Sequence, residues 1–186
     1  ASRLFKITAP GVPLLVSLDL KSLGTGVIIN NDGEIITNWH VAESYEKMLV
    51  YFFNDEINNF GDLDGYDYKI ADVLALEPSR DLALLKLQDF PKEGIKFIKL
   101  ASAYKVDIGD EVFAIGHPFG LMWTFSADYI SRIRKNYKWS YGDHECSSTV
   151  IQTQIPINQG NSGGPMFNDK GEIVGINAFG IENSQG

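Results

Sequence analysis

The sequence predicts an all-β protein built from short antiparallel strands. Short apolar runs recur along the chain, and clusters of Gly, Asn and Asp separate them. Asn-Asp-Gly at 31–33 and Asn-Asp-Lys-Gly at 168–171 are strong signals for tight turns between paired strands. Short strands at regular intervals with such turns are typical of barrels and sandwiches. No dinucleotide-binding glycine pattern, Walker motif, heptad run or internal repeat is present.

The expected strands follow the apolar and β-branched runs in chain order. They are 12–20, 26–30, 34–37, 48–53, 69–77, 82–87, 111–115, 123–133, 149–154 and 172–177. A short helical turn is expected at His40, where the apolar run that begins at 35 ends.

Composition limits the possible partners and compartments. A length of 186 residues suits one domain, or two small barrels packed as one. The net charge of −8, with one basic run at 132–135, argues against nucleic acid as a partner. No apolar run reaches the roughly 18 residues that a membrane span needs. Cys146 is the only cysteine, so no intramolecular disulfide can form, and no signal peptide is visible.

The most informative run is Gly-Asn-Ser-Gly-Gly-Pro at 160–165. Glycine has no Cβ, so its backbone can take a positive φ and approach a bound group closely. Ser162 on such a turn can present its Oγ while neighbouring N–H groups converge on one point, as beside an oxyanion hole. Taken alone, the run is equally compatible with a glycine-rich hairpin that happens to carry a serine.

The order of the titratable residues restricts the chemistry of Ser162. All three histidines precede it in the chain: His40, His117 and His144. The α/β-hydrolase order, in which His follows Ser, is therefore excluded. The subtilisin order needs an Asp before the base, and neither Asp19 nor Asp32 lies in a recognisable setting.

The order His, Asp, Ser fits without strain. His40 closes an apolar run, and Asp81 opens the apolar run 82–87. An acid at the start of a strand can be half buried and accept hydrogen bonds as an anion. Contacts between residues this far apart in sequence suit a β fold that brings loops together at one cleft.

Six motifs together resemble the HtrA (Deg) family of trypsin-like serine proteases. They are Thr-Asn-Trp-His-Val at 37–41, Asp-Leu-Ala-Leu-Leu-Lys at 81–86, Gly-His-Pro-Phe-Gly at 116–120, Ile-Gln-Thr at 151–153, Asn-Gln-Gly-Asn-Ser-Gly-Gly-Pro at 158–165 and Gly-Glu-Ile-Val-Gly-Ile-Asn at 171–177. The resemblance implies two six-stranded antiparallel β-barrels of the trypsin/chymotrypsin type, about 1–100 and about 101–186, with the active site in the cleft between them. The family's fold continues with a strand, a helix and usually a PDZ domain, so a fragment and a divergent short member are the alternatives.

The resemblance also assigns the catalytic roles. Ser162 would attack the scissile carbonyl, His40 would take and return the proton, and Asp81 would orient His40. The backbone N–H groups of Gly160 and Ser162 would form the oxyanion hole, with Asn161 as an additional contributor. No cofactor and no metal are implied.

Substrate and partners follow less directly. Pro156 stands where an acid would select Lys or Arg, and with Ile157 and Ala178 it implies a pocket for small or medium aliphatic residues. Unfolded or damaged polypeptides expose such residues, so a role in protein quality control is expected, in the periplasm or cell envelope. A homotrimer through Leu4 and Phe5 is a further expectation. The alternative is a catalytically latent or silent homologue that acts as a protein-binding or chaperone-like module.

Two segments resemble insertions. The acidic segment 54–67 is interpreted as a solvated loop, and the alternative, a calcium site on Asp62, Asp64 and Asp67, lacks the EF-hand spacing. The aromatic segment 136–148 is expected to be mobile or to face a partner. His144 and Cys146 within it are too few for a zinc site.

Three positions depart from the family. His117 replaces the usual Asn and is expected to be a structural turn variant. Asp128 replaces a usual Gly, which makes the local backbone uncertain. Asn161 is not an Asp, so no salt bridge to a new N-terminus is expected.

Overall fold

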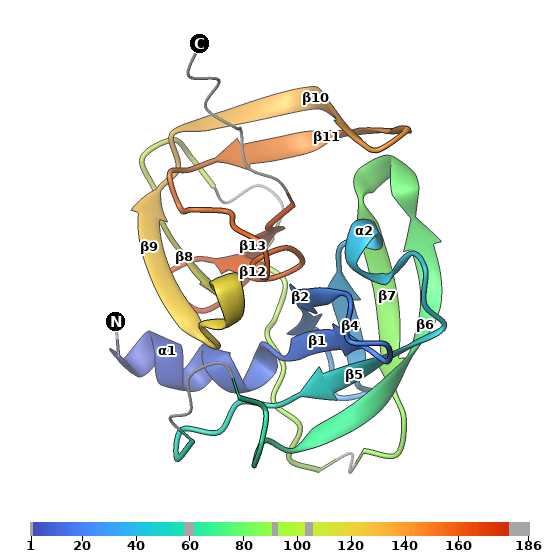
Figure 1. Cartoon of the computed structure of the whole chain (residues 1–186). Helices are drawn as coiled ribbons and strands as arrows, with labels where there is room; N and C mark the ends of the chain where they lie inside the picture. The colour runs from blue at the N-terminus through green and yellow to red at the C-terminus, as the bar shows by residue number, and fades with distance from the viewer. Residues whose placement is uncertain (1, 58–61, 91–92, 103–105, 179–186) are drawn as a thin grey trace.

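Two antiparallel sheets, formed by successive parts of the chain, lie side by side in the computed structural model, which describes residues 2–57, 62–90, 93–102 and 106–178 (Figure 1). The expectation of an all-β fold of the trypsin type is confirmed. In chain order, the elements are α1 (Ser2–Thr8), η1 (Ala9–Gly11), β1 (Leu14–Ser17), β2 (Leu23–Thr25), β3 (Val27–Ile28), β4 (Glu34–Thr37), α2 (Trp39–Ala42), β5 (Lys47–Tyr51), β6 (Tyr68–Glu77), η2 (Pro78–Arg80), β7 (Leu82–Leu87), β8 (Glu111–Gly116), η3 (Pro118–Gly120), β9 (Thr124–Tyr129), β10 (Arg132–Tyr141), β11 (His144–Gln152), β12 (Pro165–Phe167) and β13 (Ile173–Ile176).

The first sheet closes into a barrel. Its strand order is β2-β1-β5-β6-β7-β4-β3, and only Gly26 separates the two edge strands β2 and β3 in the chain. Both edges therefore belong to one bent strand, so the sheet is a six-stranded barrel without a free edge. Along β7 the burial alternates, with Ala83, Leu85 and Leu87 facing the interior. In the sequence this strand was visible as a short apolar run.

The second half contributes six further strands among the described residues. Four form the sheet β13-β12-β8-β9, and β10 and β11 form a separate hairpin. The expected strand 123–133 is wrong in its extent, because the chain breaks at 130–131 and starts a new strand at Arg132. At this break the Ser131 N–H donates to the Gln152 carbonyl (2.8 Å), which connects the hairpin to the end of the sheet.

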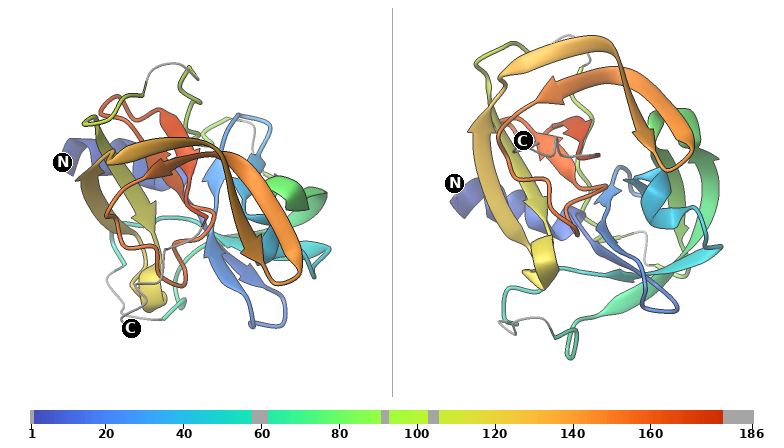
Figure 2. Two further views of the ribbon diagram at one scale, coloured as in Figure 1. Left: turned by 90° about the horizontal axis from the view of Figure 1, so that it is seen from above. Right: turned by 45° about the horizontal axis from the view of Figure 1, so that its top comes forward.

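The hairpin of β10 and β11 crosses from the second half to the first. In Figure 1 it runs over the top of the molecule and ends above α2 and β7, and the two views of Figure 2 show the same course. The interpretation of 136–148 as a mobile or partner-facing loop is therefore wrong. The aromatic residues of this segment alternate with polar ones, so they share one face of the hairpin. That face packs against the protein's own first barrel.

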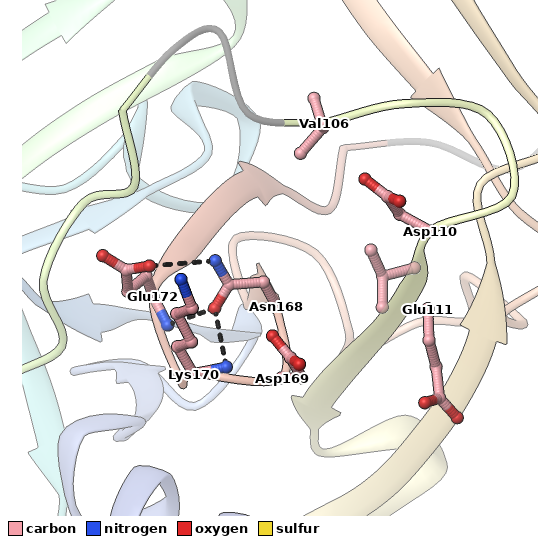
Figure 3. Close-up of a pocket in the computed structure, with 8 residues that line it drawn as sticks. Val106, Asp110, Glu111, Asn168, Asp169, Lys170 and Glu172 are labelled. Atoms are coloured by element: carbon pink, nitrogen blue, oxygen red, sulfur yellow. Dashed lines mark hydrogen bonds between the residues drawn. The ribbon is translucent and has the colours of Figure 1, made fainter.

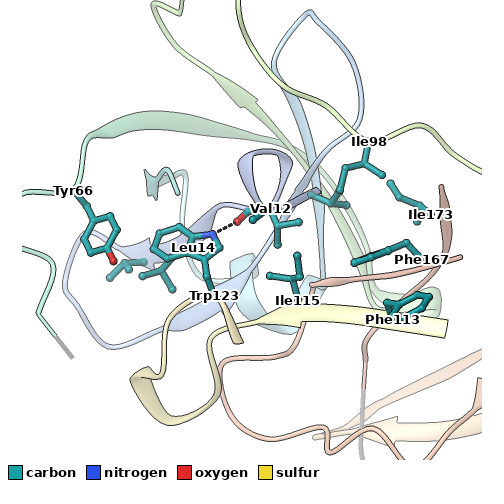
Figure 4. Packing of buried hydrophobic residues seen from close by; sticks show 12 residues of the cluster. Val12, Leu14, Tyr66, Ile98, Phe113, Ile115, Trp123, Phe167 and Ile173 are labelled. Carbon is teal, nitrogen blue, oxygen red and sulfur yellow. Dashed lines mark hydrogen bonds between the residues drawn. The ribbon is translucent and has the colours of Figure 1, made fainter. Parts of the chain in front are cut away.

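A shared core joins the two halves (Figure 4). Val12 and Leu14 of the first half pack in one cluster with Phe113 and Phe167 of the second. Trp123 lies at the centre, and its indole Nε1–H donates to the Val12 carbonyl (2.8 Å). The indole ring adds apolar contact area, and its buried hydrogen bond fixes how the two halves meet.

The N-terminal helix α1 was not expected from the sequence. Phe5 packs edge-on against Phe53 of the first half (5.4 Å between ring centroids) and Phe125 of the second (6.0 Å). Leu4 joins the same core. A homotrimer contact through Leu4 and Phe5 stays a prediction, and it would have to use only the surface that these internal contacts leave exposed. Within the described part of the chain, no helix has the length and apolar character needed to cross a membrane.

Candidate active site

A cleft of about 480 Å³ lies between the two halves. His40 and Val41 line it from the first half, and Ser162 and the residues before it line it from the second. Of the three expected pocket residues, Ile157 and Ala178 line this cleft. Pro156 does not: it is exposed, and its carbonyl accepts a hydrogen bond from the Asn161 side chain (2.8 Å).

His40 and Asp81 form a buried pair on the first barrel. Nδ1 of His40 lies 2.9 Å from both carboxylate oxygens of Asp81. The carboxylate also accepts the backbone N–H of His40 (3.1 Å), which ties it to the start of α2. The side chains are 10% and 1% exposed, respectively, so little water competes for these bonds. This arrangement orients the imidazole with its Nε2 edge directed away from Asp81.

The backbone of Asp81 explains its position. It follows the short helix η2 and takes left-handed dihedral angles (φ 54°, ψ 46°). Asp and Asn tolerate this region better than other residues with side chains. Asn38, at the N-terminus of α2, donates its side-chain Nδ2–H to the Asp81 carbonyl (3.0 Å). The loop before β7 is thereby fastened to the helix that carries His40.

The loop around Ser162 depends on two glycines. Gly160 (φ 99°) and Gly163 (φ 84°) have positive φ. A Cβ on Gly160 would collide with the His117 carbonyl, and a Cβ on Gly163 would collide with the Thr37 hydroxyl and the Thr25 carbonyl. Both positions therefore require glycine for two separate reasons, the dihedral angle and the space.

Two backbone N–H groups of this loop have no acceptor among the described residues, those of Gly160 and Ser162. Within 160–164 the other three N–H groups are used: Asn161 donates to Asn158, Gly163 to Asn177 and Gly164 to Asn161. The carbonyl of Gln159 accepts the Phe119 N–H (3.0 Å), and because the peptide bond is trans, the Gly160 N–H of the same peptide group points to the opposite side. Asn161 itself is 9% exposed and does not line the cleft; its backbone N–H donates to Asn158, and its side-chain Nδ2 donates to the Pro156 carbonyl.

Ser162 Oγ makes no hydrogen bond within the described residues, and none joins it to His40. Catalytic hydrogen bonds are often long in unliganded proteins and shorten when substrate is bound.

One face of the His40 ring is covered by Tyr141 from the β10–β11 hairpin, with 4.3 Å between ring centroids and an interplanar angle of 22°. Sequence reasoning did not identify Tyr141 or Thr25 as residues that contact the site. The aromatic residues of the segment 136–148 were the only signal for Tyr141.

His117 is a structural residue, as its turn position suggested. It is fully buried and accepts the Trp123 N–H at Nδ1 (3.0 Å). Burial lowers the pKa of His117 to about 3, so the ring stays neutral. Asp128, the other unusual residue in this half, accepts the backbone N–H of Gln154 and so fastens β9 to the segment after β11.

Two further surface features of the described residues involve local turns. A smaller hollow of about 230 Å³, shown in Figure 3, lies at the β12–β13 turn, where Asn168 Oδ1 accepts the N–H groups of Lys170 and Glu172 (both 3.0 Å). Asp62 accepts the Asp64 N–H in a similar local turn (2.9 Å). No group of three or more metal-ligating side chains occurs within the ranges that the structure describes.

The comparison with known families agrees with this geometry. A family model described as trypsin-like peptidase domain matches residues 24–176. The chain belongs to this family. The matched range begins within β2 and ends with β13, so it includes every strand except β1 and every residue of the cleft except Lys21, Ser22, Leu23 and Ala178.

The resemblance to HtrA/Deg proteases is also confirmed. This trypsin-like domain is 39% identical to the magnetosome formation protease MamE of Paramagnetospirillum magneticum, over 85% of this chain and 20% of the relative. It is 36% identical to a probable periplasmic serine endoprotease, DegP-like, of Chlamydia trachomatis, over 88% of this chain and 29% of the relative. The crystal structure of the serine endoprotease from Yersinia pestis is similar, with a TM-score of 0.76 and 29% identity over 97% of this chain and 58% of that chain. The trypsin-like domain thus spans less than a third of the length of these two curated relatives.

Proposed function

We propose that this chain is the protease domain of a serine endopeptidase of the HtrA/Deg type, which hydrolyses peptide bonds in unfolded or damaged polypeptides. The supporting observation is that Ser162 and His40 line one cleft and that Asp81 lies behind His40, within hydrogen-bond distance of its Nδ1. Relatives named serine endoproteases support the same reaction class. Because one relative is named a periplasmic protease, we include a periplasmic or envelope location in the proposal.

In the proposed mechanism, Ser162 Oγ attacks the scissile carbonyl while His40 Nε2 accepts its proton. His40 then donates that proton to the leaving amine, and water hydrolyses the acyl-enzyme by the same route. Asp81 holds the imidazole tautomer through Nδ1 and stabilises the imidazolium that forms. The unused N–H groups of Gly160 and Ser162 would donate to the oxyanion, where one such donor contributes about 3–4 kcal/mol.

The pocket residues set the proposed specificity. Ile157 and Ala178 give the cleft an apolar part without an acid, which suits a small or medium aliphatic side chain. Apolar pockets distinguish neighbouring aliphatic residues by only about 1–3 kcal/mol per methylene. Broad cleavage of exposed apolar segments is the expected consequence.

The proposal is tested by labelling with a fluorophosphonate probe, which reacts only with an activated serine, followed by peptide mass mapping. We expect an adduct on Ser162 that is absent in Ser162→Ala and retained in Ser131→Ala, a control at an exposed serine on a different loop. A folded wild-type protein that carries no adduct and cleaves no unfolded casein would overturn the proposal.

Two observations favour a second candidate, a latent homologue that binds polypeptides. Ser162 has no hydrogen bond to His40, and Tyr141 covers the imidazole. A latent protein would bind unfolded polypeptide in an anisotropy assay without labelling, and it would gain labelling once a peptide ligand is added. A silent homologue would not label under either condition.

A further inference from the structure

Tyr141 lines the candidate active-site cleft beside His40, although it comes from a hairpin of the second half and His40 from the first. Its ring lies nearly parallel to the His40 imidazole, with 4.3 Å between the centroids. It also meets Trp39, the residue before His40, edge-on at 6.2 Å. The side chain is 43% exposed, so one part contacts His40 and another part borders the open cleft.

The hairpin that carries Tyr141 is anchored at two further points on the first barrel. His144 packs against Trp39 (4.3 Å between ring centroids). Cys146 is completely buried, and its Sγ–H donates to the Pro78 carbonyl (3.2 Å). Strand pairing sets Tyr141 opposite His144, with Cys146 two residues further on, so all three side chains project from the same face. The position of Tyr141 is therefore fixed by the fold rather than by a free loop.

The electrostatic surroundings keep Tyr141 uncharged. Burial raises the pKa of its phenol, and the negative charges of Asp81 and Glu43 raise it further. A neutral aromatic ring packs well against the His40 imidazole and presents an apolar surface to the cleft.

A substrate bound for cleavage must lie beside the Tyr141 ring. Its scissile carbonyl must reach Ser162 Oγ, and its leaving amine must come within hydrogen-bond distance of His40. A residue that adjoins the scissile bond therefore passes beside the His40 imidazole, where Tyr141 already occupies one face. We propose that Tyr141 is a specificity-determining residue that closes this space to bulky side chains, so that the preferred substrates are polypeptides with a small residue at a position adjoining the scissile one. This inference rests on the proposed protease function.

The test compares cleavage of two sets of fluorogenic peptides that differ only in Ala or Leu at each position flanking the scissile residue. In Tyr141→Ala, the Leu-to-Ala ratio of kcat/KM at one flanking position should rise by about 10–200-fold. Tyr141→Phe keeps the ring and should retain the wild-type ratio. Tyr129→Ala removes a tyrosine of similar exposure on β9, outside the cleft, and serves as the matched control. If Tyr141→Ala lowers kcat/KM equally for all peptides, the residue only anchors the hairpin and the inference is overturned.

Binding separates this inference from the function on which it rests. The same peptides, carrying a fluorophore, are titrated by anisotropy against Ser162→Ala with and without Tyr141→Ala. If the wild type neither labels nor cleaves but the Leu-to-Ala ratio of Kd changes with Tyr141→Ala, the protease proposal fails and the inference stands as a rule for peptide binding. If neither the kcat/KM ratio nor the Kd ratio changes, the inference fails whatever the activity.

Discussion

Thr25 donates its hydroxyl to the carbonyl of Gly160 at 2.6 Å, across the boundary between the two halves. Its backbone N–H donates to the Ser162 carbonyl as well (2.9 Å). Strand β2 of the first barrel therefore holds the serine-bearing loop of the second half by two buried hydrogen bonds. The carbonyl groups on both sides of Asn161 are thereby tied to the first barrel.

Replacing Thr25 should test how much the loop depends on this contact. Thr25→Val keeps the shape but removes the donor, and it leaves the Gly160 carbonyl with only a long bond from the His117 N–H (3.4 Å). We expect a loss of about 1–3 kcal/mol in the free energy of unfolding. Labelling of Ser162 by a fluorophosphonate should slow by about 10-fold. Urea denaturation and labelling kinetics measure the two effects, with Thr25→Ser as the control that keeps the hydroxyl. Equal labelling rates for the two variants would contradict the role given to the hydroxyl.

Asp81→Asn should separate the fold of the site from its chemistry. Asn tolerates the left-handed dihedral angles of this position, and its side-chain oxygen can still accept the His40 N–H. The fold should therefore be kept, while the imidazole is held in the wrong tautomer. We expect turnover of a peptide substrate to fall by about 10⁴-fold. Circular dichroism checks the fold, and undiminished turnover would show that Asp81 is not the orienting acid.

His117 should make stability depend on pH. Its pKa is about 3 in the folded protein and about 6.5 in the unfolded chain, so the unfolded state binds the extra proton between these values. The neutral ring therefore contributes its full share to the free energy of unfolding above pH 6.5. Below that, the free energy of unfolding falls by about 1.4 kcal/mol per pH unit as the pH falls toward 3.

The measurement is the free energy of unfolding in urea at several pH values between 7 and 4. His117→Asn keeps an acceptor for the Trp123 N–H but removes the titrating group. The variant should be less stable at neutral pH because it fills less space, yet its stability should fall less steeply with acidification. Parallel pH profiles for wild type and variant would rule out this titration.

The Cys146 thiol should react slowly in the folded protein. It is completely buried, and burial together with the nearby charge of Asp81 raises its pKa, so little thiolate is present at neutral pH. Alkylation by iodoacetamide should be slow in the native state and reach its ordinary rate in urea. Tyr141→Ala removes a contact of the same hairpin and should speed native alkylation, whereas Tyr129→Ala should not. Fast native labelling of the wild type would mean that the hairpin opens readily.

Several elements were predictable because their signals are local. Strand β7 matches the expected 82–87, since its short apolar run and the preceding Asp are a short-range pattern. Strand β4 matches 34–37, and the Asn-Asp-Gly turn before it was visible too. The helix α1 and the length of β10 were missed, because both depend on packing against distant aromatic residues.

The sequence by itself determined the family, the fold class and the three side chains to which the catalytic roles are assigned, because each motif is a short run with its own backbone and chemical requirement. Only the tertiary structure decided what surrounds them. The folded chain sets Thr25 against Gly160, buries Asn161 away from the cleft and lays Tyr141 on His40. Some of these contacts join residues that are far apart in the chain. Others depend on which face of a strand points inward. Their geometry comes from barrel closure and hairpin docking, which no local pattern of residues specifies.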